Sequence, residues 1–527
     1  MEQFHNDLLV TEEEKHPTVM DKNEINTNST LLNKVSQKFN IFGGISLIFG
    51  STFALCFYKA GTGINYLIFV IVMVVLLCSI SKALNMVVKK ATAACYMGAI
   101  LLGLSTFLTA NETLHFLNTV GILLLLDVAL LHQIYADDKW DFVKHLGRMF
   151  GLLFHCIATI GLPLIDSYHY LGNTKLLKKD RTRNIILGMC IAIPLLWIIV
   201  LLLSSADLLF NELTGQFVEF LSSNDIVGVG IMILFGFVAC YCIICGSVRR
   251  EEVDNQKQMK RANPTIAITT MTCLCLVYVL FSGIQVIYLF ADGLFHLPQE
   301  FTFAEYARQG FFELLFVTGI NIVLIFGSTM LFEESKILRI LLICMTVCTY
   351  IMIASATYRM LLYIGTYHLT FLRLFVLLFL LIDSLVLAGV ITSVFVSKFP
   401  LFGYCVAVVS TCYILFSLGK PDYLIASYHI SHEETLDYED FQFLTVELSI
   451  DAAPIIVPIL SDPAWWNKAD TDNTVGNLAQ PNLWEQVRVG RDNYYEQITR
   501  KEQESGFRDF NYSKYLASSY ASQYPIK

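Results

Sequence analysis

The sequence predicts an all-α integral membrane protein with about 11 transmembrane helices and a small helical C-terminal domain. The 527 residues are 55% hydrophobic and only 15% charged, with a mean hydropathy of +0.57, whereas soluble proteins carry about 25% charged residues. Apolar runs of about 20 residues, the length that crosses roughly 30 Å of hydrocarbon, recur along the chain. Residues 421–527 differ, with 8 basic and 17 acidic side chains. The high hydropathy and the recurring apolar runs exclude an ordinary soluble enzyme.

Residues 1–39 form a polar and acidic N-terminal segment that includes Glu12, Glu13 and Glu14. The segment lacks the basic start, short apolar stretch and small-residue cleavage site of a signal peptide. We interpret it as a flexible cytoplasmic arm, so membrane insertion depends on the first spanning helix.

Residues 40–420 form the predicted transmembrane helical domain, because eleven of its apolar segments are long enough to span. A twelfth segment, 151–171, contains Pro163 and Asp166 and has basic residues on both flanks. Basic flanks favour the cytoplasmic side of the membrane, and a span would place its two flanks on opposite sides. This segment is therefore predicted to be interfacial or re-entrant. The predicted spans are 41–58, 64–81, 92–109, 117–135, 185–205, 225–248, 265–291, 311–332, 338–357, 369–393 and 401–419.

The distribution of Lys and Arg predicts the orientation. With the N-terminus in the cytoplasm, cytoplasmic segments hold 23 Lys and Arg residues, and the loops on the far side hold only Lys59, Arg308 and Arg359. Cytoplasmic loops are enriched in Lys and Arg, so this orientation is favoured. An odd number of spans then places the C-terminus outside the cell.

Residues 421–527 are predicted to form an acidic extracytoplasmic helical domain. Apolar residues at three- and four-residue steps indicate helices over 421–465, and Asp451 followed by Pro454 is typical of a helix start. A loop over 467–482 and a charged helix near 483–504 complete the domain. We expect three tryptophans to close its core or lie at the headgroup level: Trp465, Trp466 and Trp484.

Three stretches carry a family resemblance. They read TFAEYARQGFFEL (302–314), YRMLLY with HLTFLR (358–363 and 368–373) and DYLIASYHI (422–430). The chain resembles bacterial membrane proteins of the domain-of-unknown-function families 4153 and 4173. The resemblance extends from about residues 57–65 to FRDFNYSK at 507–514, which is similar to a terminal family pattern. It implies a multi-pass protein of the bacterial plasma membrane and no agreed activity.

Two carboxylates at membrane depth are candidate functional residues. Asp127 lies among leucines and valines in the fourth span, and Asp383 lies deep in the tenth. Each costs about 2.5–3.5 kcal/mol to insert, so intramembrane carboxylates are functional hypotheses by default. They suit proton or cation handling. The alternative is a neutral Asp hydrogen-bonded to a Ser or Thr of a neighbouring helix, or to Ser384 beside Asp383.

A second set of candidates forms a charge cluster at the outer face. Opposite charges at one depth invite pairing, and Arg binds carboxylates and phosphates bidentately. The cluster is therefore predicted to be either a vestibule for an anionic or zwitterionic ligand or an ion-pair latch that joins the loops and docks the acidic tail. Its members are Glu305, Arg308, Glu313, Arg359 and Arg373.

No cofactor or metal site is predicted. Cys240, Cys242 and Cys245 are the closest approach to a metal motif, but residues two apart on a helix lie about 200° apart and cannot share one ion. We find no phosphate loop, nucleophile elbow, kinase signature or dinucleotide fingerprint. The acidic tail argues against nucleic-acid binding.

Three functions remain open at this stage, and the first is favoured. It is a non-enzymatic sensor, regulator or scaffold. Its outer domain binds either a ligand or a protein of the membrane or cell envelope, and the lipid bilayer is its second partner. The second is an ion- or proton-coupled solute transporter that uses Asp127 and Asp383. The third is a cell-envelope enzyme with Glu305 or Glu313 as acid or base beside Arg308 and Arg359.

Overall fold

The structure is a computed structural model, and within its described residues it is helical and contains no β-strand. The all-α fold class is thus confirmed. The described residues are 31–135, 140, 142–172, parts of 192–206, 207–223, 225–249, 262–290, 311–396, 399–432, 438–462, 483–503 and 506–525.

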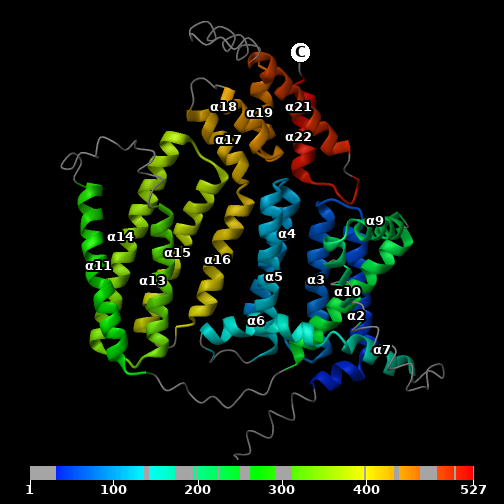
Figure 1. Ribbon diagram of the computed structural model, residues 1–527, viewed down its shortest axis with the longest axis horizontal. Coiled ribbons are helices and arrows are strands. Elements are labelled where there is room, and N and C mark those ends of the chain that lie inside the picture. The colour runs from blue at the N-terminus through cyan, green and yellow to red at the C-terminus, as the bar shows by residue number, and fades with distance from the viewer. Residues whose placement is uncertain are drawn as a thin grey trace, which may run out of the picture. The chain divides into compact units, whose positions relative to one another are not determined.

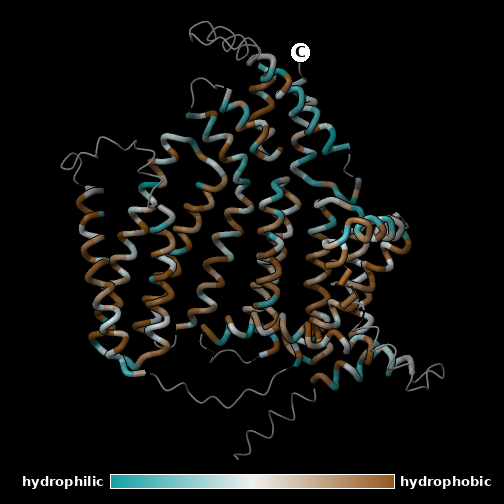
Figure 2. The backbone as a smooth tube through the Cα atoms, in the orientation of Figure 1, coloured by the Kyte–Doolittle hydropathy of each residue, from teal (hydrophilic) through white to brown (hydrophobic). Residues whose placement is uncertain are grey.

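Ten helices in the described part of the chain are long and apolar enough to cross a membrane. They match ten of the eleven predicted spans, and most of the remaining one, 185–205, lies outside the described residues. Apolar residues run along their whole length (Figure 2). The ten helices are α2 (Phe39–Phe57), α3 (Ile64–Ala83), α4 (Lys90–Leu108), α5 (Glu112–Ile134), α10 (Asp225–Val248), α11 (Pro264–Phe290), α13 (Phe311–Leu331), α14 (Lys336–Tyr367), α15 (Phe371–Phe395) and α16 (Leu401–Leu418).

The weak segment 151–171 is part of a bent helix pair. Helices α6 (Phe142–Ala158) and α7 (Leu162–Gly172) meet at an angle of 50°, which fits a broken span or a re-entrant loop. Asp166 in α7 is buried and accepts hydrogen bonds from the hydroxyls of Tyr241, at 2.7 Å, and Ser36. Its carboxyl group is therefore a satisfied part of the local packing.

The chain divides into two compact units, and only the second holds the sites described below. The first comprises the described parts of 1–51, 78–87 and 150–255, including α7, α9 (Leu208–Ser223) and α10. The second comprises 52–77, 88–149 and 256–527. Within the second unit, α4 packs on α5, α16 packs on both, and α15 packs on α16, α14 and α13, while α11 packs on α14 (Figure 1).

Hydrogen bonds between side chains join α4, α5 and α16. Asn118 of α5 is fully buried, and its amide oxygen accepts from the hydroxyls of Tyr413 and Ser417, both at 2.8 Å. Its amide nitrogen donates to Thr106 of α4 at 3.2 Å, and Ser105 bonds Ser417 at 2.6 Å. Interhelical bonds of this kind fix the rotation of spanning helices, because lipid tails supply no hydrophobic force between them.

In the described part of the chain, seven helical elements follow α16. Three of the apolar residues at three- and four-residue steps, Phe441, Leu444 and Leu448, are buried. The expected helix start near Asp451 is confirmed, with Pro454 in the first turn of α19. The elements are α17 (Pro421–His432), α18 (Tyr438–Gln442), the π-helical turn η2 (Phe443–Glu447), the 3-10 turn η3 (Ile450–Ala452), α19 (Ala453–Leu460), α21 (Leu483–Gln503) and α22 (Tyr512–Gln523).

Part of the expected tail lies outside the described residues. This includes the predicted loop at 467–482, Trp465 and Trp466, and the side chain of Trp484. The expected charged helix corresponds to α21, which is more hydrophilic than the spans (Figure 2). That residues 421–527 are a separate domain stays a prediction, because they share the second compact unit with spanning helices.

The turn before α3 pairs with the segment that leads into α22. Asn65 closes the turn, donating from its amide to the carbonyls of Cys56 at 2.6 Å and Gly61 at 2.8 Å. The backbone N–H of Ile64 donates to the carbonyl of Phe510 at 2.8 Å. Gly63 lies so close to the backbone of Asp509 and Phe510 that a Cβ atom there would overlap it.

We expect Gly63→Ala to destabilise the protein, because backbone on both sides of the contact must move to admit the methyl group. The expected loss is about 1–3 kcal/mol, measured as the thermal unfolding midpoint in lipid nanodiscs. Gly61→Ala is the matched control in the same turn, where an added Cβ meets only the Asp509 side chain at 3.7 Å. Equal midpoints for the two variants would contradict the close approach.

Candidate functional site

A buried polar cluster outside the spans centres on Asp451, in η3. Its side chain is 2% exposed and accepts hydrogen bonds from the Thr109 hydroxyl, the Ala110 backbone N–H at 2.7 Å and the Ser513 hydroxyl. Thr109 and Ala110 form the turn between α4 and α5, and Ser513 begins α22. One carboxyl group therefore holds together three segments that are far apart in the sequence.

Asn511 reinforces the same junction from the start of α22. Its amide nitrogen donates to the carbonyls of Thr109 at 2.8 Å and Thr106 at 3.3 Å, which are the free carbonyls at the end of α4. Its amide oxygen accepts from the N–H groups of Ser513 and Lys514 and so caps α22. Asn511 thus satisfies the ends of two helices at once.

Asp422, in the first turn of α17, is a second buried carboxyl group beside this junction. Its Oδ2 atom accepts from the Asn111 amide at 2.8 Å and from the Ser449 N–H at 3.1 Å. Burial raises the pKa of Asp422 above its ordinary value, and the hydrogen bonds from Ser449 and Asn111 offset part of that rise. We call the set of Asp422, Asp451, Asn111, Thr109 and Asn511 the junction cluster.

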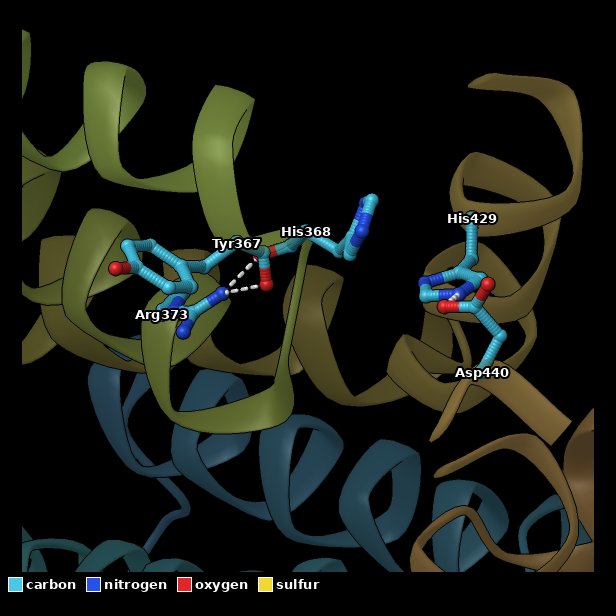
Figure 3. Close-up of polar contacts among 5 residues, drawn as sticks. All are labelled: Tyr367, His368, Arg373, His429 and Asp440. Atoms are coloured by element: carbon cyan, nitrogen blue, oxygen red, sulfur yellow. Dashed lines mark hydrogen bonds and ion pairs between the residues drawn. The ribbon is translucent and has the colours of Figure 1, made fainter. Parts of the chain in front are cut away.

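A histidine pair lies near the start of α15. His429 of α17 is 2% exposed, its Nε2 atom is 2.8 Å from Oδ1 of Asp440, and its Nδ1 atom is buried without a hydrogen-bond partner. The His368 ring, on the connection between α14 and α15, faces it with centroids 4.5 Å apart (Figure 3). His368 has a φ of 66°, a left-handed conformation that non-glycine residues rarely adopt.

Arg373, one of the predicted outer-face residues, holds the connection on which His368 lies. Its guanidinium group donates to the carbonyls of Tyr367 and His368 (Figure 3) and lies over the Tyr363 ring at 4.2 Å. A cation at the carboxyl end of a helix satisfies its last carbonyls and interacts favourably with the helix dipole. The geometry of Arg373 is therefore that of a helix cap.

The other predicted outer-face residues have different surroundings. Arg359 is buried in α14 and donates to Oε1 of Gln285 in α11 at 3.1 Å. Glu313 is exposed in the first turn of α13. Glu305 and Arg308 lie outside the described residues. A shared vestibule or ion-pair latch made of these side chains stays a prediction, because the described contacts of Arg359 and Arg373 go to separate groups.

The two membrane-depth carboxyl groups lie on helices that both pack against α16. Asp127 of α5 is half-buried, and its Oδ1 atom is enclosed without a hydrogen-bond partner. Asp383 of α15 is 6% exposed and interacts with the Thr318 hydroxyl of α13, while its Oδ2 atom has no partner. The contact with Thr318 is the kind expected for an Asp bonded to a neighbouring helix.

The sequence alone does not predict the junction cluster. It indicates Asp451 only as part of a helix start, and Asp422 only within a stretch that carries the family resemblance. The available signal was the run Thr109, Ala110, Asn111 between two spans, because polar residues in a tight turn must find partners when the turn is covered. Among the residues that the structure describes, no group of three or more His, Cys, Asp or Glu side chains is arranged to hold a metal ion.

The comparison with protein families decides the classification. Residues 96–459, which run from α4 to α19, match the family model Domain of unknown function (DUF4153). The chain belongs to the DUF4153 family. The match is shorter at both ends than the expected resemblance, and it includes Thr109, Asn111, Asp422 and Asp451 of this DUF4153 protein but not Asn511. A search of curated proteins gave no match, and neither did a search of solved structures.

We expect substitution of Asp451 to loosen the junction cluster. Asp451→Ala leaves three buried donors without their acceptor and should cost about 3–5 kcal/mol, whereas Asp451→Asn keeps one oxygen and should cost about 1–2 kcal/mol. Thermal unfolding in nanodiscs, together with hydrogen exchange of residues 109–111, measures both effects. Asp492→Asn, at an exposed site of α21, is the control, and an equal loss there would contradict the assignment.

Asp422 should make stability depend on pH in a defined direction. The pKa of Asp422 in the folded state is raised above its ordinary value of about 3.9. Between these two pKa values the folded state binds more protons than the unfolded state. Stability therefore falls as pH rises through this range, by at most about 1.4 kcal/mol per pH unit. Asp422→Asn keeps an acceptor for Asn111 and Ser449 but cannot ionise. Unfolding midpoints from pH 4 to 8 should therefore fall less in the variant, and parallel curves would contradict this.

Proposed function

We propose that this DUF4153 protein is a non-enzymatic sensor, regulator or scaffold of the membrane. In this proposal its C-terminal helices bind a ligand or a protein partner, and its spanning helices anchor or relay that binding. The observation that carries the proposal is the junction cluster. Asp451 accepts from donors in the α4–α5 turn and at the start of α22, so the C-terminal helices are fixed directly to the ends of spanning helices.

The junction cluster supports coupling between the C-terminal helices and the spanning helices, because its buried bonds resist movement of either set of helices relative to the other. A binding event that displaces α22 must stretch or break the bonds of Asn511 to the end of α4 and of Ser513 to Asp451. The same bonds resist movement of α4 and α5 relative to the C-terminal helices. Two sites joined by shared contacts influence each other by the same free energy in both directions.

In this proposal, exposed valines on the C-terminal helices form the apolar part of the partner surface. Val446 of η2 is 70% exposed and Val489 of α21 is 52% exposed, and these two elements pack against each other. The surrounding segment is acidic, with 17 acidic and 8 basic residues over 421–527. A partner with an apolar centre and basic rim fits this combination. We place this face outside the cell in the bacterial plasma membrane, with a membrane or cell-envelope protein as the partner.

An ion- or proton-coupled transporter that uses Asp127 and Asp383 is the second candidate. It is favoured by one observation, which is that each of these residues holds a buried carboxyl oxygen without a hydrogen-bond partner at membrane depth. A group of this kind is expensive to retain in a spanning helix unless it has a use. The two candidates differ in which part of the chain must remain intact for function.

Complementation of cells that lack the protein separates the two candidates. We expect the double substitution Val446→Ser and Val489→Ser to reduce function at normal membrane levels, because it removes the apolar centre of the partner surface. Val87→Ser is the matched control, since Val87 is 88% exposed outside the C-terminal helices. Full function of the double variant together with loss of function in Asp383→Asn would contradict the proposal and favour transport.

A further inference from the structure

A polar cluster lies at mid-length in the helices α13, α14 and α15, separate from the junction cluster. It consists of Thr318 and Asn321 of α13, Thr349 of α14 and Asp383 of α15, all of them buried. These three helices pack against one another (Figure 1). At 1.5 Å per residue, Asp383 is about 18 Å from the start of α15 and Asn321 about 15 Å from the start of α13. Both lie near the middle of a span.

The hydrogen bonds of Thr349 fix the orientation of the Asn321 amide. The Thr349 hydroxyl donates to the carbonyl of Met345 at 2.8 Å, so toward Asn321 it can only accept. The Asn321 nitrogen donates to it at 3.0 Å. The amide oxygen therefore points away from Thr349, and it is buried without a hydrogen-bond partner.

A second polar contact joins α13 to α15. The Thr318 hydroxyl donates to the carbonyl of Leu315 at 2.8 Å and also hydrogen-bonds the Asp383 carboxyl group. The second carboxyl oxygen of Asp383, Oδ2, is buried without a partner. Thr318 and Asn321 are three residues apart on one face of α13, with Cβ atoms about 5–6 Å apart. The Asn321 and Asp383 oxygens without partners therefore both belong to residues that neighbour Thr318.

A buried carboxyl or amide oxygen that lacks a donor is costly in a dry environment, and a positive species can supply the missing partner. A proton on Asp383 would turn its carboxyl group into a donor toward Thr318. A small monovalent cation would be coordinated by carboxylate, amide and hydroxyl oxygens, which are the hard ligands that such ions prefer. Either species would also remove most of the cost of a charged side chain at the bilayer centre.

We propose that Asp383, Thr318 and Asn321 form an exchangeable cation-binding site at mid-membrane, which takes a proton or a small monovalent cation such as Na⁺. Asp383 supplies the charge, Thr318 and Asn321 supply neutral oxygens, and Thr349 holds the Asn321 amide in place. Two tyrosines border the site. Tyr350 of α14 donates to the carbonyl of Ser384 at 3.0 Å, and Tyr404 of α16 donates to that of Leu385 at 2.8 Å. This site does not depend on partner binding by the C-terminal helices.

Infrared difference spectroscopy of the full chain in nanodiscs tests the proposal. Spectra of the wild type minus those of Asp383→Asn isolate the Asp383 carboxyl group, and the Asn side chain can still donate to Thr318, so the variant should fold. The spectra are recorded from pH 5 to 9 in Na⁺ and in choline. A protonated-carboxyl band that titrates with pH and is unaffected by Na⁺ identifies the proton. A carboxylate band that shifts with Na⁺ and not with choline identifies the cation.

Two outcomes would overturn the proposal. One is an Asp383 carboxyl group that stays protonated over the whole pH range and is insensitive to Na⁺, since that group would be a structural hydrogen-bond donor. The other is a carboxylate signal that responds to neither pH nor Na⁺. Each outcome leaves the proposed role of the C-terminal helices untouched, so the two proposals fail separately.

Substitution of the neutral ligands provides the second readout. Thr318→Val and Asn321→Leu should each weaken the apparent affinity for the bound species by about tenfold or more, measured as the concentration of Na⁺ or the pH at half-change of the Asp383 band. Thr346→Val is the matched control, because Thr346 is equally buried in α14 and donates to the carbonyl of Leu342 in its own helix. An equal shift in the Thr346 variant would also contradict the proposed ligands.

Discussion

The hydrogen bonds accepted by Asp451 are the constraint on which the packing of the C-terminal helices in the second unit depends. A turn between two spanning helices leaves backbone and hydroxyl donors that water normally satisfies, and here the C-terminal helices cover that turn. Covering it without an acceptor would cost about 1–3 kcal/mol for each buried donor. Asp451 removes that cost for Thr109, Ala110 and Ser513 together. The C-terminal helices can therefore pack on the spans only in the register that brings η3 to the α4–α5 turn.

The two carboxyl groups of the junction cluster act in different ways. Asp451 accepts from three donors on two other segments, the α4–α5 turn and the start of α22, so its main effect is to fix positions. Asp422 accepts two bonds on one oxygen, and burial raises its pKa, so its contribution to stability changes with pH. A junction with both kinds of group holds the helices in fixed positions, while its contribution to stability changes with pH. That combination suits a protein in which binding at the C-terminal helices is relayed to the membrane.

Inside the spans, some polar side chains follow the same rule of satisfaction and others depart from it. Asn118 makes bonds to three neighbouring hydroxyls, which is the usual use of an amide between spanning helices. Asn321 and Asp383 each keep a buried oxygen without a partner. Buried polar atoms in native proteins are almost always satisfied, so each exception needs an explanation, and a bound proton or ion is the one we propose here. The contrast between these two clusters is what points to a cation site.

The sequence alone determined the fold class and ten of the spans, because the length and hydropathy of a spanning helix are set by the thickness of the bilayer and not by its neighbours. It also identified Asp383 as costly, and it located the start of α19 from Asp451 and Pro454. It did not reveal that Asp451 satisfies the α4–α5 turn or that Asp383 faces Thr318. Nor did it show that Arg359 and Arg373 bond separate groups. These facts join residues up to 342 positions apart, and only tertiary packing decides which helix faces meet.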